Sequence, residues 1–250
     1  MKNLRLLVAG VGDAFSARYY SSCLAVEADG SWLLIDCPHP IRKVLCEASI
    51  SAGIALDLDQ ITGVALTHLH ADHCSGLEGL GFYNRFVLDR RAPLLAHPLV
   101  SARLWDAHLA AGMETALQNR GQPPAVRRFE DFFDLVPVGE SKAVTFGPFS
   151  ILSRQTVHTV PTTAFLVRAG ERCLGYSADT AFDPDLIDWL AGADLIVHEC
   201  NPGLLHTLYE DLAGLSEALR AKMRLIHYPD DFDVDQSIIE PLHQGSLYLV

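Results

Sequence analysis

The sequence contains no apolar run that approaches the roughly 18–20 residues needed to cross a bilayer. Its first residues, MKNLRLLVAGVGDAFS, also lack the longer apolar stretch and small-residue cleavage site of a secretory signal, because Asp13 interrupts the run early. We therefore expect a cytoplasmic protein without membrane association, in which residues 4–9 form a first strand.

Cysteine is scarce and unpatterned. The six cysteines are scattered, and none belongs to a Cys-x-x-Cys pair. A chain of 250 residues can bury enough apolar surface to fold without disulfides, which a reducing cytosol disfavours. Most of the six are expected to be small core residues, although Cys74 and Cys200 each adjoin a candidate site residue.

Positive charge is also in short supply, since 19 lysines and arginines face 31 acidic residues, for a net charge of −12. Such a chain repels a polyanion unless its basic residues are concentrated. They are concentrated only in residues 80–130, where seven arginines face four acidic residues. This segment is either an ordinary solvated helical face or a surface that steers an anionic substrate.

No repeat or low-complexity stretch divides the chain, so we expect a single α/β domain over residues 1–250. Short strands come first, with a hairpin turn at ADGS, and later strands alternate with helices, which predicts two sheets with helices outside. Helices are expected at about residues 41–52, from 97 to an end at Gly121, and at 210–223.

The stretch VALTHLHADHCSGLEGL, residues 64–80, brings three histidines and an aspartate into six positions: His68, His70, Asp72 and His73. Because they follow an apolar strand, a tight loop can turn all four side chains toward one point. Imidazole together with carboxylate suits zinc, iron or manganese better than calcium or magnesium. The stretch therefore predicts a metal site.

Other candidate ligands directly follow apolar strands, which is where an α/β sheet presents its site residues. His158 follows SILSRQTV, Asp179 follows CLGYSA, and His227 follows MRLI. His198 follows DLIV and competes for the same role on local pattern alone.

The segment THLHADH resembles the Thr-His-x-His-x-Asp-His signature of the metallo-β-lactamase superfamily. His158, Asp179 and His227 come in that superfamily's order, and GVGDAFS, LLIDC and HEC extend the likeness over the whole chain. The resemblance implies a four-layer αββα sandwich with two divalent metal ions between the sheets, most simply zinc, with iron or manganese as alternatives. It implies that one ion is held by His68, His70 and His158, the second by Asp72, His73 and His227, and that Asp179 bridges both.

Two such ions can share a hydroxide, which would attack an electrophilic carbon or phosphorus. Asp36 and Thr67 are then candidates to orient the metal ligands, although Asp36 could instead be a plain turn residue at a strand end.

HECNPGLLHT resembles the His-Glu-Ala-Thr element and the later His-Ser/Thr element of ribonuclease Z and its phosphodiesterase relatives. The resemblance implies that Glu199 and His206 form a proton-delivery pair for the leaving group. A carboxylate beside an imidazole fixes its tautomer and makes it a fit general acid. The alternative is a capping His206 with a structural Glu199. Asp72, Glu199 and His206 are the candidate catalytic residues.

The chain also departs from ribonuclease Z, whose tRNA-gripping arm lies between the third metal histidine and the bridging aspartate. Here only 20 residues separate His158 from Asp179. With the acidic net charge, this favours a small anionic phosphodiester over tRNA. A carboxylic ester, thioester or lactone is the alternative substrate, and a di-iron redox or oxygen-binding protein is the alternative of another class.

Residues 82–140 are rich in aromatic and arginine residues, and insertions at this place lie near the cleft mouth in the resembled superfamily. We expect a helical insertion that forms a lid, a substrate wall or the contact of a homodimer. Arg85 is a candidate to steer substrate, and His39, on the loop after Asp36, is a candidate substrate contact.

Overall fold

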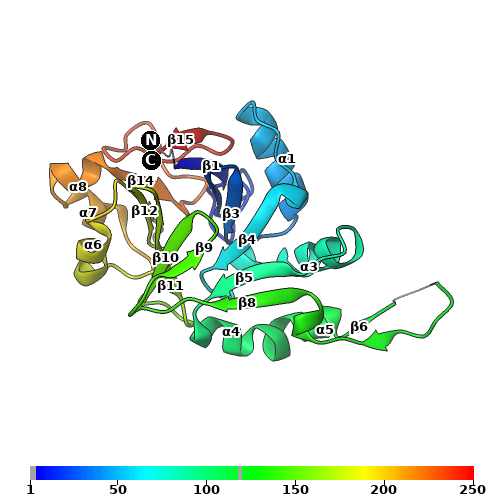
Figure 1. Cartoon of the computed structure of the whole chain (residues 1–250). Helices are drawn as coiled ribbons and strands as arrows, with labels where there is room; N and C mark the ends of the chain where they lie inside the picture. Colours follow the sequence, from blue (N-terminus) through cyan, green and yellow to red (C-terminus); the bar gives the residue numbers. More distant parts are fainter. Residues whose placement is uncertain (1–3, 118–119) are drawn as a thin grey trace.

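The computed structural model describes residues 4–117 and 120–250. Two large β-sheets lie face to face, and helices cover the outer side of each (Figure 1). This is the four-layer αββα sandwich expected from the sequence. The two ends of the chain lie side by side because β15 (Leu247–Leu249) pairs with β1 (Arg5–Gly10).

The first sheet has the strand order β15-β1-β2-β3-β4-β5-β8. The ADGS turn joins β2 and β3, and its central Asp29 and Gly30 both have positive φ angles, as a two-residue hairpin turn requires. From β3 onward the strands are parallel. Their bounds are β2 (Cys23–Ala28), β3 (Ser31–Ile35), β4 (Ile61–Leu66), β5 (Ala92–Ala96) and β8 (Phe133–Pro137).

The second sheet has the order β14-β13-β12-β11-β10-β9. Strands β12, β13 and β14 are parallel, whereas β10, β11 and β12 alternate in direction, so β10 runs the same way as β12. Their bounds are β9 (Val144–Phe146), β10 (Phe149–Gln155), β11 (Thr163–Ala169), β12 (Arg172–Tyr176), β13 (Leu195–Glu199) and β14 (Met223–Ile226).

Strand β1 shows how the sequence divides between the layers. Leu6 and Val8 point into the core between the sheets, and Leu7 and Ala9 point into the core under the outer helices. Successive side chains of a strand face opposite ways, so a continuous apolar run is what a strand buried on both faces requires.

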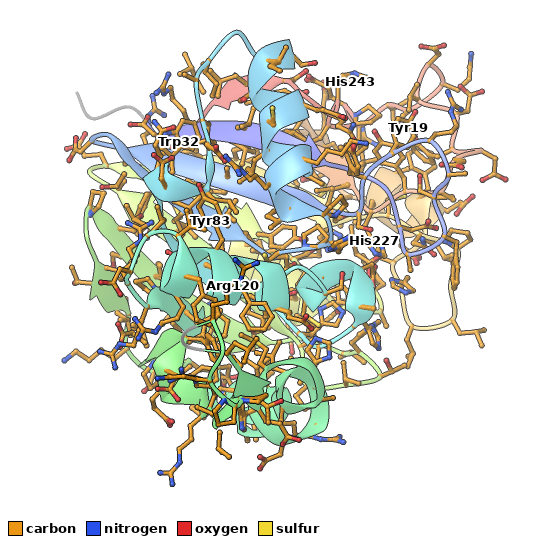
Figure 2. The ribbon with its side chains drawn as sticks, turned by 90° about the vertical axis from the view of Figure 1, so that its right-hand side faces the viewer. Tyr19, Trp32, Tyr83, Arg120, His227 and His243 are labelled. Carbon is orange, nitrogen blue, oxygen red and sulfur yellow. The ribbon has the colours of Figure 1, made fainter. Side chains whose placement is uncertain are left out.

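Helices α1 (Ile41–Ser51) and α3 (Leu77–Phe86) cover the outer face of the first sheet. The guanidinium of Arg42 on α1 lies 4.9 Å from the ring centre of Tyr83 on α3, which ties the two helices together. Tyr83 is labelled in Figure 2. Helix α6 (Pro184–Leu190) packs on the second sheet. The remaining short elements are η1 (Leu58–Gln60), α2 (Ala71–Cys74), η3 (Phe129–Asp131), α7 (Tyr209–Ala213) and α8 (Glu217–Ala221).

Two helices have other bounds than the sequence predicts. The helix expected to reach Gly121 runs through α4 (Pro98–Leu104), the π-helical η2 (Trp105–Leu109) and α5 (Ala110–Met113), and stops there. Instead β6 (Thr115–Ala116) pairs with β7 (Ala125–Val126). The helix expected at 210–223 is split, because Gly214 caps α7 and the Ser216 side chain caps the start of α8. Residues 118–119 lie outside the described part.

Segment 82–140 is only partly helical. Strands β5 and β8 extend the first sheet, because their apolar residues pair in parallel with β4 and with each other. The α4–η2–α5 helix lies outside that sheet, and the β6–β7 ribbon projects from the body of the protein (Figure 1). Within the described residues, no helix combines the length and apolar character that crossing a membrane requires.

Candidate metal centre

The candidate ligands gather where parallel strands end. His68 and its neighbours follow β4, His158 follows β10, Asp179 follows β12, and His227 follows β14. A hydrogen bond from the Thr163 amide to the Thr67 carbonyl, at 3.1 Å, joins the two sheets at this edge. Strand ends of both sheets thus open onto one shared site.

The first group of ligand atoms consists of three imidazole nitrogens and a carboxylate oxygen. His70 Nδ1 lies 3.1 Å from His68 Nε2 and 3.2 Å from His158 Nε2. Asp179 Oδ2 lies 3.7 Å from His68 Nε2 and 3.9 Å from His158 Nε2. These are the separations of ligands that surround one ion.

The second group consists of Asp72, His73 and His227. Asp72 Oδ2 lies 3.2 Å from His73 Nε2 and 3.3 Å from His227 Nε2. Asp179 reaches this group too, with Oδ1 3.4 Å from His73 Nε2 and Oδ2 3.5 Å from His227 Nε2. The Asp179 carboxylate therefore lies between the two groups.

Hydrogen bonds fix which nitrogen of His68 faces the centre. The Thr67 hydroxyl lies 2.9 Å from both Asp36 oxygens and from His68 Nδ1. It donates its single proton to the Asp36 carboxylate, so it accepts from His68 Nδ1–H. The lone pair of His68 is then on Nε2, which points into the first group.

His73 and His158 are held in the same way. His73 Nδ1 donates to Asp36 Oδ2 at 2.8 Å, and His158 Nδ1 donates to the Leu205 carbonyl at 3.1 Å. Because both acceptors lack a proton of their own, the proton of each ring is on Nδ1. The lone pair on Nε2 of each ring is then directed at the ligand groups. His70 is reversed, since its Nε2 contacts the Thr159 hydroxyl at 3.2 Å and its Nδ1 faces the centre.

This donor set fits divalent metal ions. In tetrahedral geometry, ligands about 2.0–2.1 Å from zinc lie roughly 3.3–3.4 Å apart, close to the nitrogen separations of the first group. In the second group, His73 Nε2 and Asp179 Oδ1 are buried without a hydrogen-bond partner among the described residues. Buried polar atoms are normally paired, so two orphans facing one point favour a cation there.

The protonation states of the candidate residues suit metal ligands. Burial lowers the pKa of His68, His70 and His158, which keeps these imidazoles neutral as metal binding requires. Burial raises the pKa of Asp72, but the facing imidazoles of His227 and His73 hold it well below its usual range. Burial lowers the pKa of His73, but the carboxylates of Asp179 and Asp36 raise it above the ordinary value. A cation at His73 Nε2 would displace that proton.

Three non-glycine residues at the site have left-handed backbones, with φ angles of 64° at Asp36, 53° at Ala178 and 60° at His227. Side-chain-bearing residues seldom adopt such angles, which recur where a functional site overrides local preference. They turn the chain sharply at the ends of β3, β12 and β14, where Asp36, Asp179 and His227 have to face the centre.

Glu199 and His206 lie beside both groups. His206 Nδ1 is 2.9 Å from each Glu199 carboxylate oxygen. Its ring centre lies 5.1 Å from that of His158 and 5.3 Å from that of His227, against which it stacks. His206 is half-buried, so its Nε2 can meet a bound substrate.

Three other candidates are not part of the two groups. His198 is buried with Nδ1 donating to the Glu199 carbonyl, and burial lowers its pKa to about 4. His39 is exposed on the loop beside the metal segment, where its amide donates to Ser75 Oγ. Arg85 on α3 pairs at 2.9 Å with Asp89, which lies just beyond the end of that helix.

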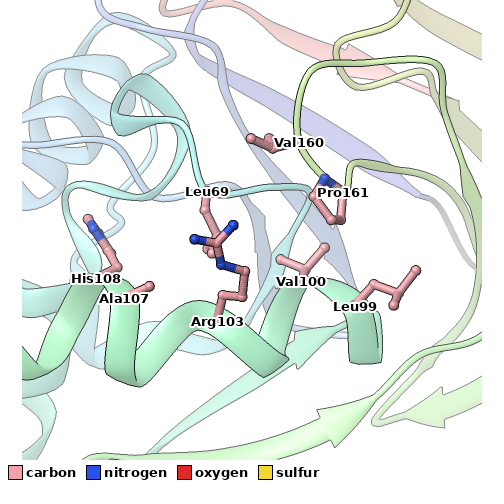
Figure 3. A pocket seen from close by; sticks show the side chains of 8 residues that line it. All are labelled: Leu69, Leu99, Val100, Arg103, Ala107, His108, Val160 and Pro161. Atoms are coloured by element: carbon pink, nitrogen blue, oxygen red, sulfur yellow. The ribbon is translucent and has the colours of Figure 1, made fainter.

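The structure adds contributors that the sequence did not single out. Thr159 contacts His70, and the carbonyl of Leu205 positions His158. Arg103 on α4 lines a pocket with Leu69, which separates His68 from His70 (Figure 3). Thr159 could have been suspected from its place next to His158, whereas a backbone carbonyl and a distant helix leave no sequence signal.

Comparison with known proteins places the chain in a family. Residues 4–248 match the sequence profile of the family described as Anti-Pycsar protein Apyc1. The chain belongs to the Apyc1 family. An Anti-Pycsar protein Apyc1 from Bacillus phage 010DV004 is 30% identical over 267 residues, covering 99% of this chain and 98% of that protein. The Apyc1 protein of Saccharibacillus brassicae is 30% identical over 260 residues, covering 98% and 99%.

Solved structures agree on the fold of this Apyc1-family chain. The metallo-β-lactamase fold protein YhfI from Bacillus subtilis superposes with a TM-score of 0.75 at 19% identity, covering 99% and 100% of the two chains. A diphosphatase from the PhnP family gives 0.73 at 18%, covering 98% and 97%, and the short form of human tRNase Z gives 0.66 at 16%, covering 98% of each. The chain therefore has the metallo-β-lactamase fold, and with the His/Asp cluster this supports a metal-dependent hydrolase.

Asp36 is expected to control metal affinity, because it orients His73 directly and His68 through Thr67. Asp36→Asn replaces one acceptor oxygen with a donor, so it cannot accept from both partners. We expect metal affinity to fall by about 10–100-fold, the usual effect of losing such a partner, as measured by competition with a chromophoric chelator. Asp57→Asn, at an exposed carboxylate paired with Arg42, should leave it unchanged. Equal affinity in Asp36→Asn and the wild type would contradict this role.

Proposed function

We propose that this protein is a metal-dependent hydrolase of a small anionic phosphodiester. The observation behind this choice is the Glu199–His206 pair, in which the His206 ring lies against His158 of one ligand group and His227 of the other. An alkoxide expelled from phosphorus is a poor leaving group unless it is protonated, whereas a thiolate departs without that help. A dedicated acid at this position therefore favours phosphodiester cleavage over thioester hydrolysis.

The metals would be held as the two ligand groups suggest, with His68, His70 and His158 at one ion, and Asp72, His73 and His227 at the other. Asp179 would contact both. Two divalent ions bound there would make water nucleophilic near neutral pH and offset the charge of the phosphoryl oxygens. The buried Asp36–Thr67 pair keeps the imidazoles directed at these positions.

His206 is proposed to deliver the proton. Its Nδ1–H donates to Glu199, which fixes the ring and leaves Nε2 to hold a proton toward the departing oxygen. Burial raises the pKa of Glu199, and the negative charge of Asp179 raises it further, so this carboxyl retains a proton to higher pH than an exposed one would. The Thr180 amide donates to Glu199 and fixes the carboxylate.

A small substrate is favoured over tRNA. Between His158 and Asp179 the chain forms only β11, β12 and short turns, which leaves no length for a gripping arm. Three arginines of the net-positive segment are also engaged elsewhere: Arg85 and Arg91 pair with Asp89 and Asp134, and Arg90 donates to Asn84 and the Ile61 carbonyl. They are therefore poorly placed to bind a polyanion.

The test compares substrates on metal-loaded protein. An aryl phosphodiester should be hydrolysed with a kcat/KM at least tenfold above those of an aryl thioester and a lactone. Metal analysis and a visible spectrum of aerobically purified protein address the redox alternative. Faster thioester or lactone turnover, or stoichiometric iron with a charge-transfer band and no hydrolysis, would contradict the proposal.

A further inference from the structure

Ser177 directly follows β12 and lies two positions before Asp179, whose carboxylate lies between the two ligand groups. The residue is completely buried, and its amide donates to the Val197 carbonyl at 3.0 Å. The pairing of β12 with β13 therefore extends to Ser177, and the chain turns away from the sheet directly after it.

The Ser177 hydroxyl bonds two backbone groups at once. Its Oγ donates to the Ala178 carbonyl at 2.7 Å and accepts the Glu199 amide at 2.9 Å. A hydroxyl has one proton to donate and lone pairs that accept, so both bonds form together. One side chain thus joins the residue before Asp179 to the carboxyl residue of the proposed proton-delivery pair.

The Glu199 amide depends on this acceptor. Along β13, the amides of Ile196 and Cys200 donate to backbone carbonyls on the β14 side of the strand. The Glu199 amide faces the opposite side, toward the end of β12, and there the Ser177 hydroxyl accepts its proton in place of a strand carbonyl. A buried amide without an acceptor is strongly disfavoured, so the loss of this hydroxyl would force Glu199 to shift.

The Ala178 carbonyl belongs to a residue with a left-handed backbone. Its φ angle is 53°, a conformation that a residue with a Cβ rarely adopts. The turn directs Asp179 toward the ligand groups, with its oxygens 3.4 Å from His73 Nε2 and 3.7 Å from His68 Nε2. The hydrogen bond from Ser177 holds the carbonyl in the turned position and offsets part of the conformational cost.

The other end of the turn is fixed by different contacts. The Thr180 amide donates to the Glu199 carboxylate, and the Thr207 hydroxyl donates to the Thr180 carbonyl at 2.9 Å. The turn therefore contacts Glu199 twice, through Ser177 at its backbone and through Thr180 at its side chain. A change at Ser177 would reach both Asp179 and Glu199.

We propose that Ser177 is a positioning residue that couples the two parts of the site. Its hydroxyl holds Asp179 in place for metal binding and Glu199 in place for proton delivery. The first part rests on the candidate ligand groups alone, whereas the second also rests on the proposed function. Because Ser177 acts through the backbone of its neighbours, its removal should change metal affinity and kcat rather than KM.

Ser177→Ala removes both hydrogen bonds and little volume. We expect its affinity for zinc to fall by about tenfold, within the usual effect of losing a group that supports metal ligands, as measured by competition with a chromophoric chelator. At saturating zinc, kcat for a dialkyl phosphodiester should fall by at least about tenfold, because proton delivery is impaired. For a p-nitrophenyl diester the factor should be smaller, and KM should stay near the wild-type value for both substrates.

Ala178→Gly tests the link to the left-handed turn. Glycine adopts a positive φ angle without a steric penalty, so this change lowers the cost that the Ser177 hydroxyl offsets. In the wild-type background it should change zinc affinity by less than about threefold, whereas in Ser177→Ala it should restore most of the lost affinity, because the two sites are coupled. It should not restore kcat for the dialkyl substrate, since the Glu199 amide still lacks its acceptor.

Ser153→Ala is the matched control. Ser153 is a buried serine of the same sheet, and its hydroxyl donates to the Val138 carbonyl at 3.3 Å. Its replacement should lower Tm but leave zinc affinity and both kcat values near those of the wild type. If Ser177→Ala likewise lowers only Tm, Ser177 has a purely structural role and the proposal is wrong. It is equally wrong if Ala178→Gly changes zinc affinity by the same factor in both backgrounds.

Zinc affinity also separates this proposal from the proposed function. If Ser177→Ala weakens zinc binding and Ala178→Gly restores it, but the wild type hydrolyses no phosphodiester, the positioning of Asp179 stands and the proposed reaction fails. If the wild type hydrolyses phosphodiesters and Ser177→Ala matches it in zinc affinity and in both kcat values, only the positioning proposal fails. If Ser177→Ala does not fold, the double variant with Ala178→Gly carries the test: tight zinc binding with a lowered dialkyl kcat is expected, and a wild-type kcat would overturn the proposal.

Discussion

Asp179→Ala should abolish phosphodiester turnover, with kcat at least about 1,000-fold lower, and lose at least one equivalent of metal. Its two oxygens approach ligand nitrogens of both groups, at 3.4 Å from His73, 3.5 Å from His227 and 3.7 Å from His68. Removing the carboxylate should therefore weaken metal binding at both positions. It would also leave the positive charge of any remaining ion less well compensated. Metal stabilisation of a transition state is worth several kcal/mol, which corresponds to a factor of this size.

The measurement combines elemental analysis of the purified variant with its turnover of an aryl phosphodiester. Asp188→Ala removes an exposed carboxylate from α6 and should keep full metal content and activity. If Asp179→Ala retains two equivalents of metal and turns over within tenfold of wild type, Asp179 does not bridge the ions.

His206→Ala should slow hydrolysis according to how much the leaving group needs a proton. For a dialkyl phosphodiester, whose leaving group is an alkoxide, the loss should be about 100–10,000-fold, the usual contribution of a general acid. For a p-nitrophenyl diester, whose leaving anion is stable, it should be less than tenfold. Glu199→Gln should follow the same pattern, because the amide no longer stabilises a protonated imidazole.

The pH dependence of dialkyl phosphodiester hydrolysis gives an independent test of proton delivery by His206 and Glu199. Burial raises the pKa of Glu199, so the proton of this carboxyl is present at low pH and is lost as pH rises through that raised pKa. The rate of dialkyl phosphodiester hydrolysis should therefore decline at high pH in the wild type. In His206→Ala this decline at high pH should be missing. His243→Ala, at an exposed histidine, serves as the control. Equal losses for both leaving groups, accompanied by loss of metal, would show that His206 is a ligand instead.

The clustering of the candidate ligands could be predicted from sequence because their signals are local or tied to strand ends. His68, His70, Asp72 and His73 lie within six residues, and His158, Asp179 and His227 each follow an apolar run. Parallel strands place their carboxyl ends at one edge, so the pattern alone suggests that these residues meet.

Other features depend on tertiary contacts that leave no local mark. The helix that ends at Met113 has a sequence able to continue, but Thr115 and Ala116 pair with Val126 and Ala125 instead. The same limit applies to Arg103, which reaches the metal loop only because α4 packs across the edge of the first sheet. A homodimer and a cytoplasmic location remain predictions from the sequence.

The central claim is that two metal ions at this cluster drive phosphodiester hydrolysis. The direct measurement is a zinc titration of chelator-treated protein, with bound metal and aryl phosphodiester turnover recorded at each addition. We predict tight binding of two equivalents, with turnover negligible at the start and reaching its plateau only as the second equivalent is bound. Turnover that persists without metal, or a plateau at one equivalent, would contradict the account.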